Sequence, residues 1–208
     1  MLQELWNRYP CLTVCAQEIE AAAQTMIACY EAKNKVMTCG NGGSCADADH
    51  IVGELMKGFL KARPLSAEKK QAFKARCPQL EDSLLNRLQE GLPALSLCSL
   101  TALNTAFCND VDPSLIYAQS VLGLGSSGDV LLCMSTSGNA KNVCAAATVA
   151  KAMGISVIGL TGQTGGRLAA IADLCIRVPE TETFKVQELH LPVYHYLCAA
   201  TEAHFFPV

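Results

Sequence analysis

The sequence has little of what nucleic-acid-binding and membrane proteins need. Its 16 Lys and Arg residues are outnumbered by 19 Asp and Glu residues, for a formal net charge of −3. Such a chain has no strong basic field with which to hold nucleic acid by its phosphates. No stretch reaches the roughly 18 apolar residues typical of a membrane span, and the segment around Glu4 and Arg8 lacks the apolar core of a signal peptide. We therefore expect a cytoplasmic protein that binds neither nucleic acid nor membrane.

Two cysteine and glycine patterns are also absent. The twelve cysteines include no C-x-x-C pair and are scattered through apolar segments of a 208-residue chain. Disulfide scaffolds are shorter and loop-rich, so we expect these cysteines to serve as small core residues in a reducing compartment. The P-loop pattern G-x-x-x-x-G-K-[ST] is missing as well, which excludes a phosphate site of that kind.

The composition favours one α/β domain spanning residues 1–208. Half of the residues are hydrophobic and the mean hydropathy is +0.24, so a sizeable core is available. Apolar surface in excess of the core is often buried between subunits. We therefore expect a homo-oligomer.

The order of apolar segments predicts a doubly wound sheet. Residues 11–33 have the apolar spacing of one long helix. Five short apolar segments then alternate with helical patterns: Lys35–Cys39, Ala94–Cys98, Val130–Met134, Ser156–Leu160 and Leu174–Val178. None alternates strictly between apolar and polar residues, which is typical of strands buried on both faces of a parallel sheet. The βαβα order predicts a five-stranded parallel sheet flanked by helices.

Two helix starts are marked by capping residues. Asp112 followed by Pro113 predicts an N-cap and a first-turn proline, opening a helix through Gly123. Asn139 is a candidate cap for a helix that ends at Gly154.

Residues 59–92 interrupt this alternation of strands and helices, and their pattern predicts two short polar helices. The segment is rich in basic side chains, namely Lys61, Arg63, Lys69, Lys70, Lys74, Arg76 and Arg87. Two interpretations are open: a lid over an anionic substrate, or a solvated surface hairpin.

Glycine and hydroxyl residues follow three of the predicted strands. The loops are Gly40-Asn41-Gly42-Gly43-Ser44, Ser135-Thr136-Ser137-Gly138-Asn139 and Thr161-Gly162-Gln163-Thr164-Gly165-Gly166. Glycine allows close backbone approach, and N–H groups at a helix start bind oxyanions. In an open parallel sheet the ligand lies at the carboxyl ends of the strands. We therefore expect phosphate to be bound there by backbone N–H and hydroxyl groups, with the first and third strands beside the switch point.

A further candidate site combines two distant segments. His50 and Glu54 are four residues apart and project from one helix face. Gln187, His190 and His195 lie near the other end of the chain. A His–Glu pair with a second His is a possible zinc set. The alternative is an ordinary surface pair.

Several of these segments together resemble one family. The runs CGNGGSCADADHIVGEL, LLCMSTSGNAKNV, VIGLTGQTGG, CIRVPET and VQELHLPVYH are similar, in this order, to those of the SIS (sugar isomerase) phosphoheptose isomerases. The resemblance covers residues 11–200 apart from 59–92. It implies an SIS fold, a homotetramer, and isomerisation of sedoheptulose 7-phosphate to D-glycero-D-manno-heptose 7-phosphate.

The resemblance also implies roles for individual residues. Glu54 and His195 would be the acid–base pair. The substrate would be bound by Asn41, Gly42, Gly43, Ser44, Asp110, Ser135, Thr136, Ser137 and Gln187. One Zn²⁺ per subunit would be held by His50, Glu54, Gln187 and His195. The family's final phosphate serine is replaced here by Ala140, and the 59–92 segment is longer than its counterpart.

An SIS protein without catalysis is the alternative, either a sugar-phosphate-binding regulator or a protein that associates with the bacterial initiator DnaA. Such relatives lack the counterparts of Glu54 and His195, so the presence of both residues here favours an enzyme.

The spacing of Gln187 and His195 raises a geometric question. On one continuous helix their Cα atoms would lie about 12 Å apart along the axis, too far to share an ion easily. A helix starting near Glu188, with Pro192 in its first turn, would free Gln187. The other solution is a site completed by a neighbouring subunit, which we favour.

Overall fold

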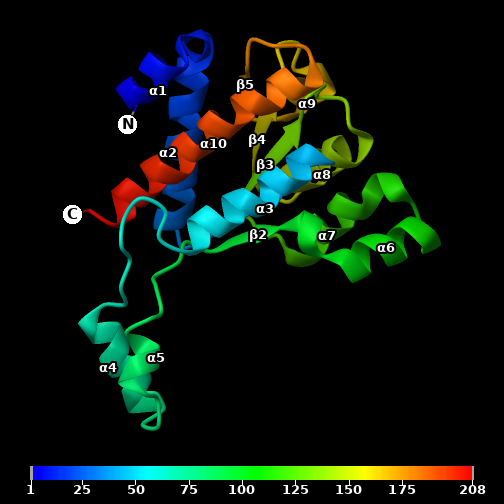
Figure 1. The fold of residues 1–208 in the computed structure, drawn as a ribbon. Helices are drawn as coiled ribbons and strands as arrows, with labels where there is room; N and C mark the ends of the chain where they lie inside the picture. The colour runs from blue at the N-terminus through cyan, green and yellow to red at the C-terminus, as the bar shows by residue number, and fades with distance from the viewer. Residues whose placement is uncertain (1, 208) are drawn as a thin grey trace.

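One parallel sheet organises the chain. The computed structural model describes residues 2–207 and shows five strands in the order β2-β1-β3-β4-β5, all paired in parallel (Figure 1). The strands are β1 (Val36–Cys39), β2 (Ala94–Ser96), β3 (Val130–Ser135), β4 (Ser156–Thr161) and β5 (Leu174–Arg177). Each begins at the predicted residue or one residue later. The order reverses between β1 and β3, so the predicted fold and switch point are both confirmed.

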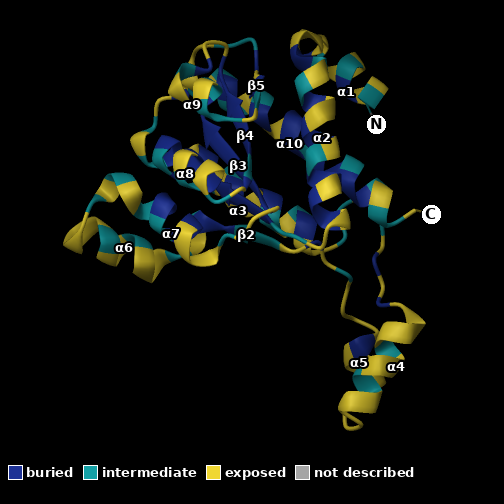
Figure 2. Ribbon diagram, turned by 180° about the vertical axis from the view of Figure 1, so that it is seen from behind, coloured by how far each residue is buried: buried dark blue, intermediate teal, exposed yellow. Residues whose placement is uncertain are grey.

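Both faces of the sheet are covered by helices, which explains why the strands do not alternate. In β1, Val36 packs into one apolar cluster, while Met37 and Cys39 pack into the other. The first cluster includes residues of α2 (Ala16–Glu31), α3 (Gly43–Met56) and α10 (Thr183–Phe205). The second includes residues of α7 (Ile116–Leu124), α8 (Lys141–Ala152) and α9 (Gly166–Ile171). The three central strands β1, β3 and β4 are accordingly buried on both sides, while the edge strands β2 and β5 are only partly buried (Figure 2).

The remaining helices are short. They are α1 (Leu2–Arg8), η1 (Pro10–Cys15), α4 (Ala67–Arg76), α5 (Asp82–Leu85), η2 (Leu97–Ser99), α6 (Thr101–Asp110) and η3 (Pro113–Leu115). The predicted helix over 11–33 is therefore wrong at its start, where a 3-10 turn with a leading proline precedes α2. None of the helices between residues 2 and 207 has the length and apolar character to cross a membrane.

One predicted cap is confirmed and one is wrong. Asp112 Oδ1 accepts from Ser114 N at 2.7 Å, and Pro113 opens the 3-10 turn that leads into α7. Asn139 does not cap α8, whose N-cap is Ala140. Its Oδ1 instead accepts from Arg167 N at 3.1 Å. Asn139 therefore ties the loop after β3 to the start of α9.

Helix α10 is continuous over 23 residues, with Pro192 in its interior. The alternative of a helix starting near Glu188 is therefore excluded, because Gln187 lies inside the helix. Because proline has no N–H, the carbonyl of Glu188 loses its helical partner. Pro192 itself is buried, so the helix tolerates it within the core layer.

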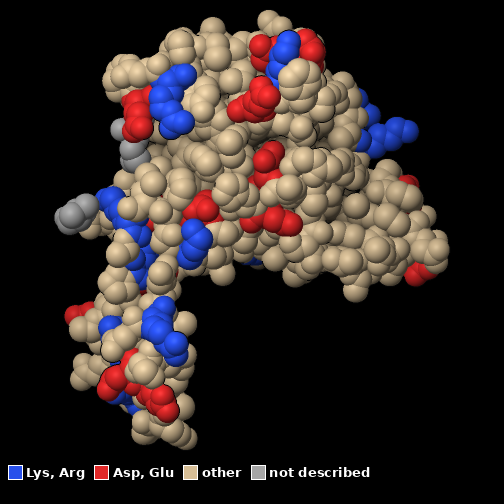
Figure 3. Space-filling model, viewed as in Figure 1, with Lys and Arg blue, Asp and Glu red and all other residues tan. Residues whose placement is uncertain are grey.

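The 59–92 segment forms a helical hairpin, α4 and α5, that projects from the body (Figures 1 and 2). It leaves the body after α3 ends at Met56, the opposite end of that helix from Gly43. Two of its basic residues are paired with acids, Lys69 with Glu90 and Lys74 with Asp82. Figure 3 shows blue and red side chains mixed along the hairpin. The surface-hairpin interpretation holds for this chain, since the hairpin does not cover the carboxyl ends of the strands.

The stalk of the hairpin is anchored by a buried ion pair. Arg63 and Glu202 are about 1% and 0% exposed and meet at 2.8 Å. The other Glu202 contacts are the N–H groups of Phe59 and Leu60, both at 2.8 Å. Arg63 also donates from Nη1 to Leu55 O at 2.7 Å and from Nη2 to Glu54 O at 3.2 Å. Arg63 is thus part of the core, although its charge in a basic segment suggested a surface role.

We predict that Glu202→Gln lowers the free energy of unfolding by about 3–5 kcal/mol, because it leaves the buried Arg63 charge uncompensated. The control is Asp82→Asn, which breaks a largely exposed ion pair and changes stability little. Urea unfolding followed by circular dichroism measures both, and the midpoint should fall with an unchanged slope for Glu202→Gln. Equal midpoints for the two variants would contradict the anchoring role.

Candidate active site

A cavity of about 360 Å³ opens at the carboxyl ends of β1 and β3. Its walls are the loop after β1, the loop after β3 and the first two turns of α10. The lining residues are Asn41, Gly42, Gly43, Ser44, Met134, Ser135, Thr136, Ser137, Ala140, Thr183 and Gln187. The structure thus brings together every predicted substrate-binding residue except Asp110. We call this space the phosphate cavity.

Three helix N-termini supply the positive potential of the phosphate cavity. Helices α3, α8 and α10 begin there, and none has a side-chain hydrogen bond at its N-cap. The aligned peptide dipoles place partial positive charge at such ends, where anions bind. No Lys or Arg is among the lining residues. Phosphate recognition here would rest on backbone N–H and hydroxyl groups, in agreement with the sequence.

The loop after β1 has backbone requirements that only glycine meets. Gly42 adopts φ 55°, ψ −120°, in the left-handed half of conformational space. A Cβ on Gly43 would lie 2.3 Å from Gln187 Nε2. Asn41 and Asn142 exchange two amide hydrogen bonds of 2.8 and 2.9 Å, which tie this loop to α8.

The third glycine-rich loop does not line the phosphate cavity, so that part of the prediction is wrong. It lies behind the second loop, where Gly162 N donates to Thr136 O at 3.0 Å. A Cβ on Gly138 would lie 2.0 Å from Gly165 O. The glycines of the third loop therefore allow two loops to pack against each other, and no ligand is needed to explain them.

Asp110 lies apart from the other candidates. It is the exposed last residue of α6, and its Oδ1 accepts from Asn109 Nδ2 at 2.8 Å. It lines neither cavity described here. The resemblance assigned it to the sugar, and within this chain the structure does not bring it there.

The candidate acid–base residues meet where α3 runs beside α10. His50 Nε2 lies 3.3 Å from Glu54 Oε1. The rings of His50 and His195 are edge-on, with centroids 5.2 Å apart. Lys57 Nζ contacts the other Glu54 oxygen at 3.1 Å. The three candidate groups are therefore neighbours within one chain, and a second chain is not needed to bring Glu54 and His195 together.

The His195 imidazole is held as a neutral group. Burial lowers its pKa and so favours the neutral imidazole, while Glu54 acts in the opposite direction. Its Nε2 is buried without a hydrogen-bond partner among residues 2–207. A neutral imidazole with an unused nitrogen can accept a proton or bind a metal.

His50, Glu54 and His195 are residue types that bind zinc, but the structure does not space them as a zinc site. Two imidazoles and a carboxylate are ordinary zinc ligands, and His195 Nε2 is the orphaned atom that a metal would satisfy. Gln187 does not join them, because its amide lies against Gly43 in the phosphate cavity. Within the part of the chain that the structure describes, no three His, Cys, Asp or Glu side chains are spaced as a metal site.

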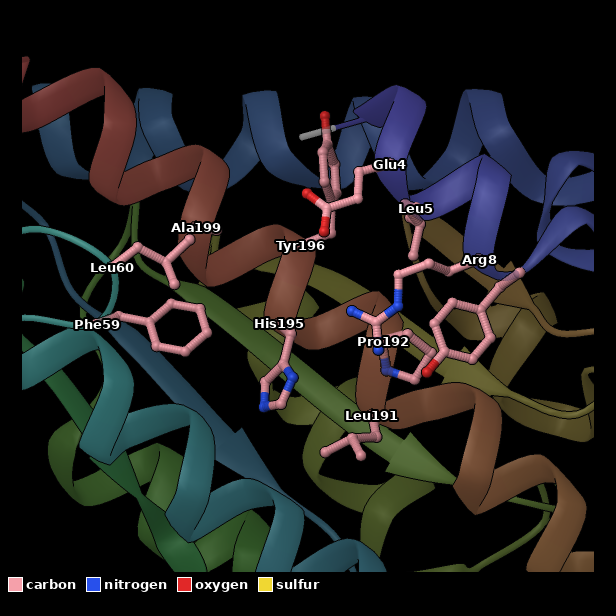
Figure 4. Close-up of a pocket in the computed structure, with 11 residues that line it drawn as sticks. Glu4, Leu5, Arg8, Phe59, Leu60, Leu191, Pro192, His195, Tyr196 and Ala199 are labelled. Atoms are coloured by element: carbon pink, nitrogen blue, oxygen red, sulfur yellow. The ribbon is translucent and has the colours of Figure 1, made fainter.

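A second cavity, of about 370 Å³, reaches His195 from another side. It lies between α1, the hairpin stalk and α10, and Figure 4 shows its lining side chains. These are Glu4, Leu5, Arg8, Tyr9, Phe59, Leu60, Leu191, Pro192, His195, Tyr196 and Ala199. His195 therefore lies between this space and the His50–Glu54 pair.

The sequence did not indicate three residues that the structure places at the site. Thr183 lines the phosphate cavity. Tyr194 and Asp47 form a hydrogen-bonded chain behind His50. Asp47 precedes His50 by three residues, so helical spacing could have found it. His190 is fully buried and lines neither of the two cavities. Burial lowers its pKa to about 4, which makes it a neutral core residue.

The fold and the phosphate cavity define the chain as an SIS-domain protein, and the SIS domain family model matches residues 11–90 and 83–162. The chain is 40% identical to the phosphoheptose isomerase of Rhodospirillum rubrum over 90% of this chain and 86% of that protein. It is 36% identical to that of Aneurinibacillus thermoaerophilus over 90% and 82% of the two chains.

Solved structures agree with these similarities. The phosphoheptose isomerase of Francisella tularensis aligns with a TM-score of 0.73 at 31% identity, covering 89% of this chain and 85% of that one. That of Neisseria gonorrhoeae aligns with a TM-score of 0.70 at 30% identity, covering 98% and 100%. The chain belongs to the phosphoheptose isomerase family, as its motifs predicted.

We predict that Gly43→Ala weakens anion binding about tenfold, because the new Cβ must displace the Gln187 amide from the phosphate cavity. Gly53→Ala is the matched control on the same helix, since its Cβ would meet nothing within 4 Å. Calorimetric titration with a sugar phosphate measures the affinity, and thermal melting checks the fold. Unchanged affinity in Gly43→Ala would remove Gln187 from the anion site.

Proposed function

We propose that the chain is an aldose–ketose isomerase that converts sedoheptulose 7-phosphate to D-glycero-D-manno-heptose 7-phosphate. The observation that carries this proposal is the arrangement of two sites along α10. Gln187 lines the phosphate cavity near the start of the helix, and two turns later His195 lies beside His50, whose Nε2 is 3.3 Å from Glu54 Oε1. Relatives named phosphoheptose isomerases, up to 40% identical over 90% of the chain, support the same function.

The separation of the two sites fits a long substrate. Eight residues of helix span about 12 Å along the axis. A seven-carbon chain with a terminal phosphate can place the phosphate at one site and its first two carbons at the other. A three-carbon phosphate cannot reach both. The phosphate would then fix the carbon chain so that the reacting atoms approach the acid–base groups in one orientation.

The reaction requires proton transfer between C1 and C2 through an enediolate. Glu54 and the neutral His195 are the groups placed to exchange these protons. A positioned acid–base pair contributes about 10²–10⁴-fold in rate. Lys57 Nζ lies 3.1 Å from Glu54 Oε2, while His50 contacts Glu54 Oε1.

Zn²⁺, one per subunit, is the proposed cofactor. His50, Glu54 and His195 would hold it, with Gln187 the least supported of the four ligands implied by the resemblance. A bound zinc ion would polarise the substrate carbonyl. The proposal rests on the donor types and on the orphaned His195 nitrogen.

The relatives favour the isomerase over the non-catalytic alternatives, since proteins 40%, 36% and 35% identical to this chain are named phosphoheptose isomerases. A cytoplasmic location remains a prediction from the sequence.

A homotetramer with shared sites also remains a proposal. Exposed leucines on the hairpin and its stalk support an assembly, because Leu60, Leu84 and Leu88 are 63%, 42% and 44% exposed. Apolar side chains presented together in this way often pack against another subunit. Since Glu54 and His195 both lie beside His50 within one chain, a neighbour would contribute other residues, such as Asp110. Analytical ultracentrifugation tests the assembly.

We predict that the purified protein converts sedoheptulose 7-phosphate to the aldoheptose phosphate, as followed by NMR. Glu54→Gln should lower kcat by at least 10²-fold, since it removes the proposed base. Glu188→Gln, an exposed position on α10, is the control and should retain activity. No turnover of any ketose phosphate, with or without added Zn²⁺, would refute the enzyme proposal. Turnover of shorter sugars alone would keep the reaction class and reject the substrate.

We further predict that chelation lowers activity and that added Zn²⁺ restores it. Metal analysis before and after treatment gives the stoichiometry, which should approach one ion per chain. Full activity in protein shown to be metal-free would leave His50, Glu54 and His195 with proton transfer alone.

A further inference from the structure

A chain of hydrogen bonds runs behind the His50–Glu54 pair. Tyr194 OH lies 3.0 Å from His50 Nδ1 and 3.2 Å from Asp47 Oδ1. On the other side of the ring, His50 Nε2 lies 3.3 Å from Glu54 Oε1. The imidazole therefore lies between a phenol backed by one carboxylate and a second carboxylate.

Counting protons fixes the direction of these hydrogen bonds. The Tyr194 hydroxyl has one proton to donate. The hydroxyl donates this proton to Asp47 Oδ1 at 3.2 Å. The phenol oxygen must then accept from His50, which requires a proton on Nδ1.

We propose that Tyr194 and Asp47 are positioning residues that keep the proton of His50 on Nδ1, so that Nε2 is the nitrogen presented to Glu54. This inference rests on the proposed function for its purpose, but its geometry stands independently. The His50 side chain is 43% exposed, so packing alone does not restrain its ring. The Tyr194 side chain, by contrast, is about 1% exposed and is fixed within the core.

This proton position would favour a cation between His50 Nε2 and Glu54 Oε1. With Nδ1 protonated, the neutral ring directs a lone pair from Nε2 towards the Glu54 carboxylate. Two acceptors facing each other at hydrogen-bond distance need a proton or a metal ion between them. Without Tyr194 and Asp47, Glu54 would draw the imidazole proton onto Nε2 and occupy that place.

Nitrogen NMR of the imidazoles in chelator-treated protein tests the proposal directly. Long-range ¹H–¹⁵N spectra, recorded at a pH where the rings are neutral, distinguish protonated from unprotonated nitrogens. The four histidines are assigned by single His→Gln variants. In the unmodified protein His50 should have a protonated Nδ1 and a bare Nε2. Tyr194→Phe and Asp47→Asn should both move the proton to Nε2.

Tyr196→Phe is the matched control, because Tyr196 lies on the same helix and points away from His195 (Figure 4). It should leave the His50 spectrum unchanged. Calorimetric titration with Zn²⁺ provides a second readout, and Tyr194→Phe should bind it about 10–100-fold more weakly. In kinetics, kcat should fall by a similar factor while KM stays near its original value, because the phosphate cavity lies at the start of α10.

A protonated Nε2 in the unmodified protein, or an unchanged spectrum in a folded Tyr194→Phe, would overturn the proposal. If the protein turns over no sugar phosphate at all, the proposed function fails. The spectra and the Zn²⁺ titration would still decide whether Tyr194 and Asp47 control His50.

Discussion

The buried ion pair between Arg63 and Glu202 fixes the relation between the two helices on which the candidate acid–base groups lie. Arg63 binds the final carbonyls of α3, including that of Glu54, and Glu202 is part of α10. A buried charge is costly unless its partner is in place. The contact between α3 and α10 is therefore specified by charge as well as by apolar packing. This contact also fixes the position of Glu54, whose carbonyl binds Arg63.

In contrast to the α3–α10 contact, the phosphate cavity contains no charged side-chain pair. It has no cationic side chain among its lining residues and relies on three helix starts. The position of the backbone therefore matters more than any one side chain. This explains why the glycines at 42 and 43 are constrained, while the replacement of one expected phosphate serine by Ala140 is compatible with the site.

The strands and the phosphate loops could be predicted because each depends on a local pattern. Buried parallel strands are continuous apolar runs, and residues after their carboxyl ends must converge. The role of Arg63 could not be predicted, because its partner Glu202 lies 139 residues away in sequence. Asn139 was misplaced for the same reason, since its partner lies on a later helix. The position of Pro192 inside α10 could not be decided locally, because a local rule against proline inside helices yields to packing in a core layer.

The acid–base cluster was predictable only as a set of residue types. Helical spacing pairs His50 with Glu54, but nothing local places His195 beside them or Gln187 apart from them. That separation is set by the continuity of α10, a tertiary property. Tyr194 gives no signal of its own, being one aromatic residue among the core positions of that helix.

The hairpin stalk has an implication for how this family can vary. Its two arms are paired at Pro64 and Gln89, and Glu90 N donates to Arg63 O at 2.7 Å. The chain thus enters and leaves the projecting helices at neighbouring points. Lengthening such a loop costs little, about 0.6 kcal/mol for each doubling. The stalk is therefore a junction at which a segment can be lengthened, removed or exchanged, while the Arg63 anchor holds α3 and α10 in place.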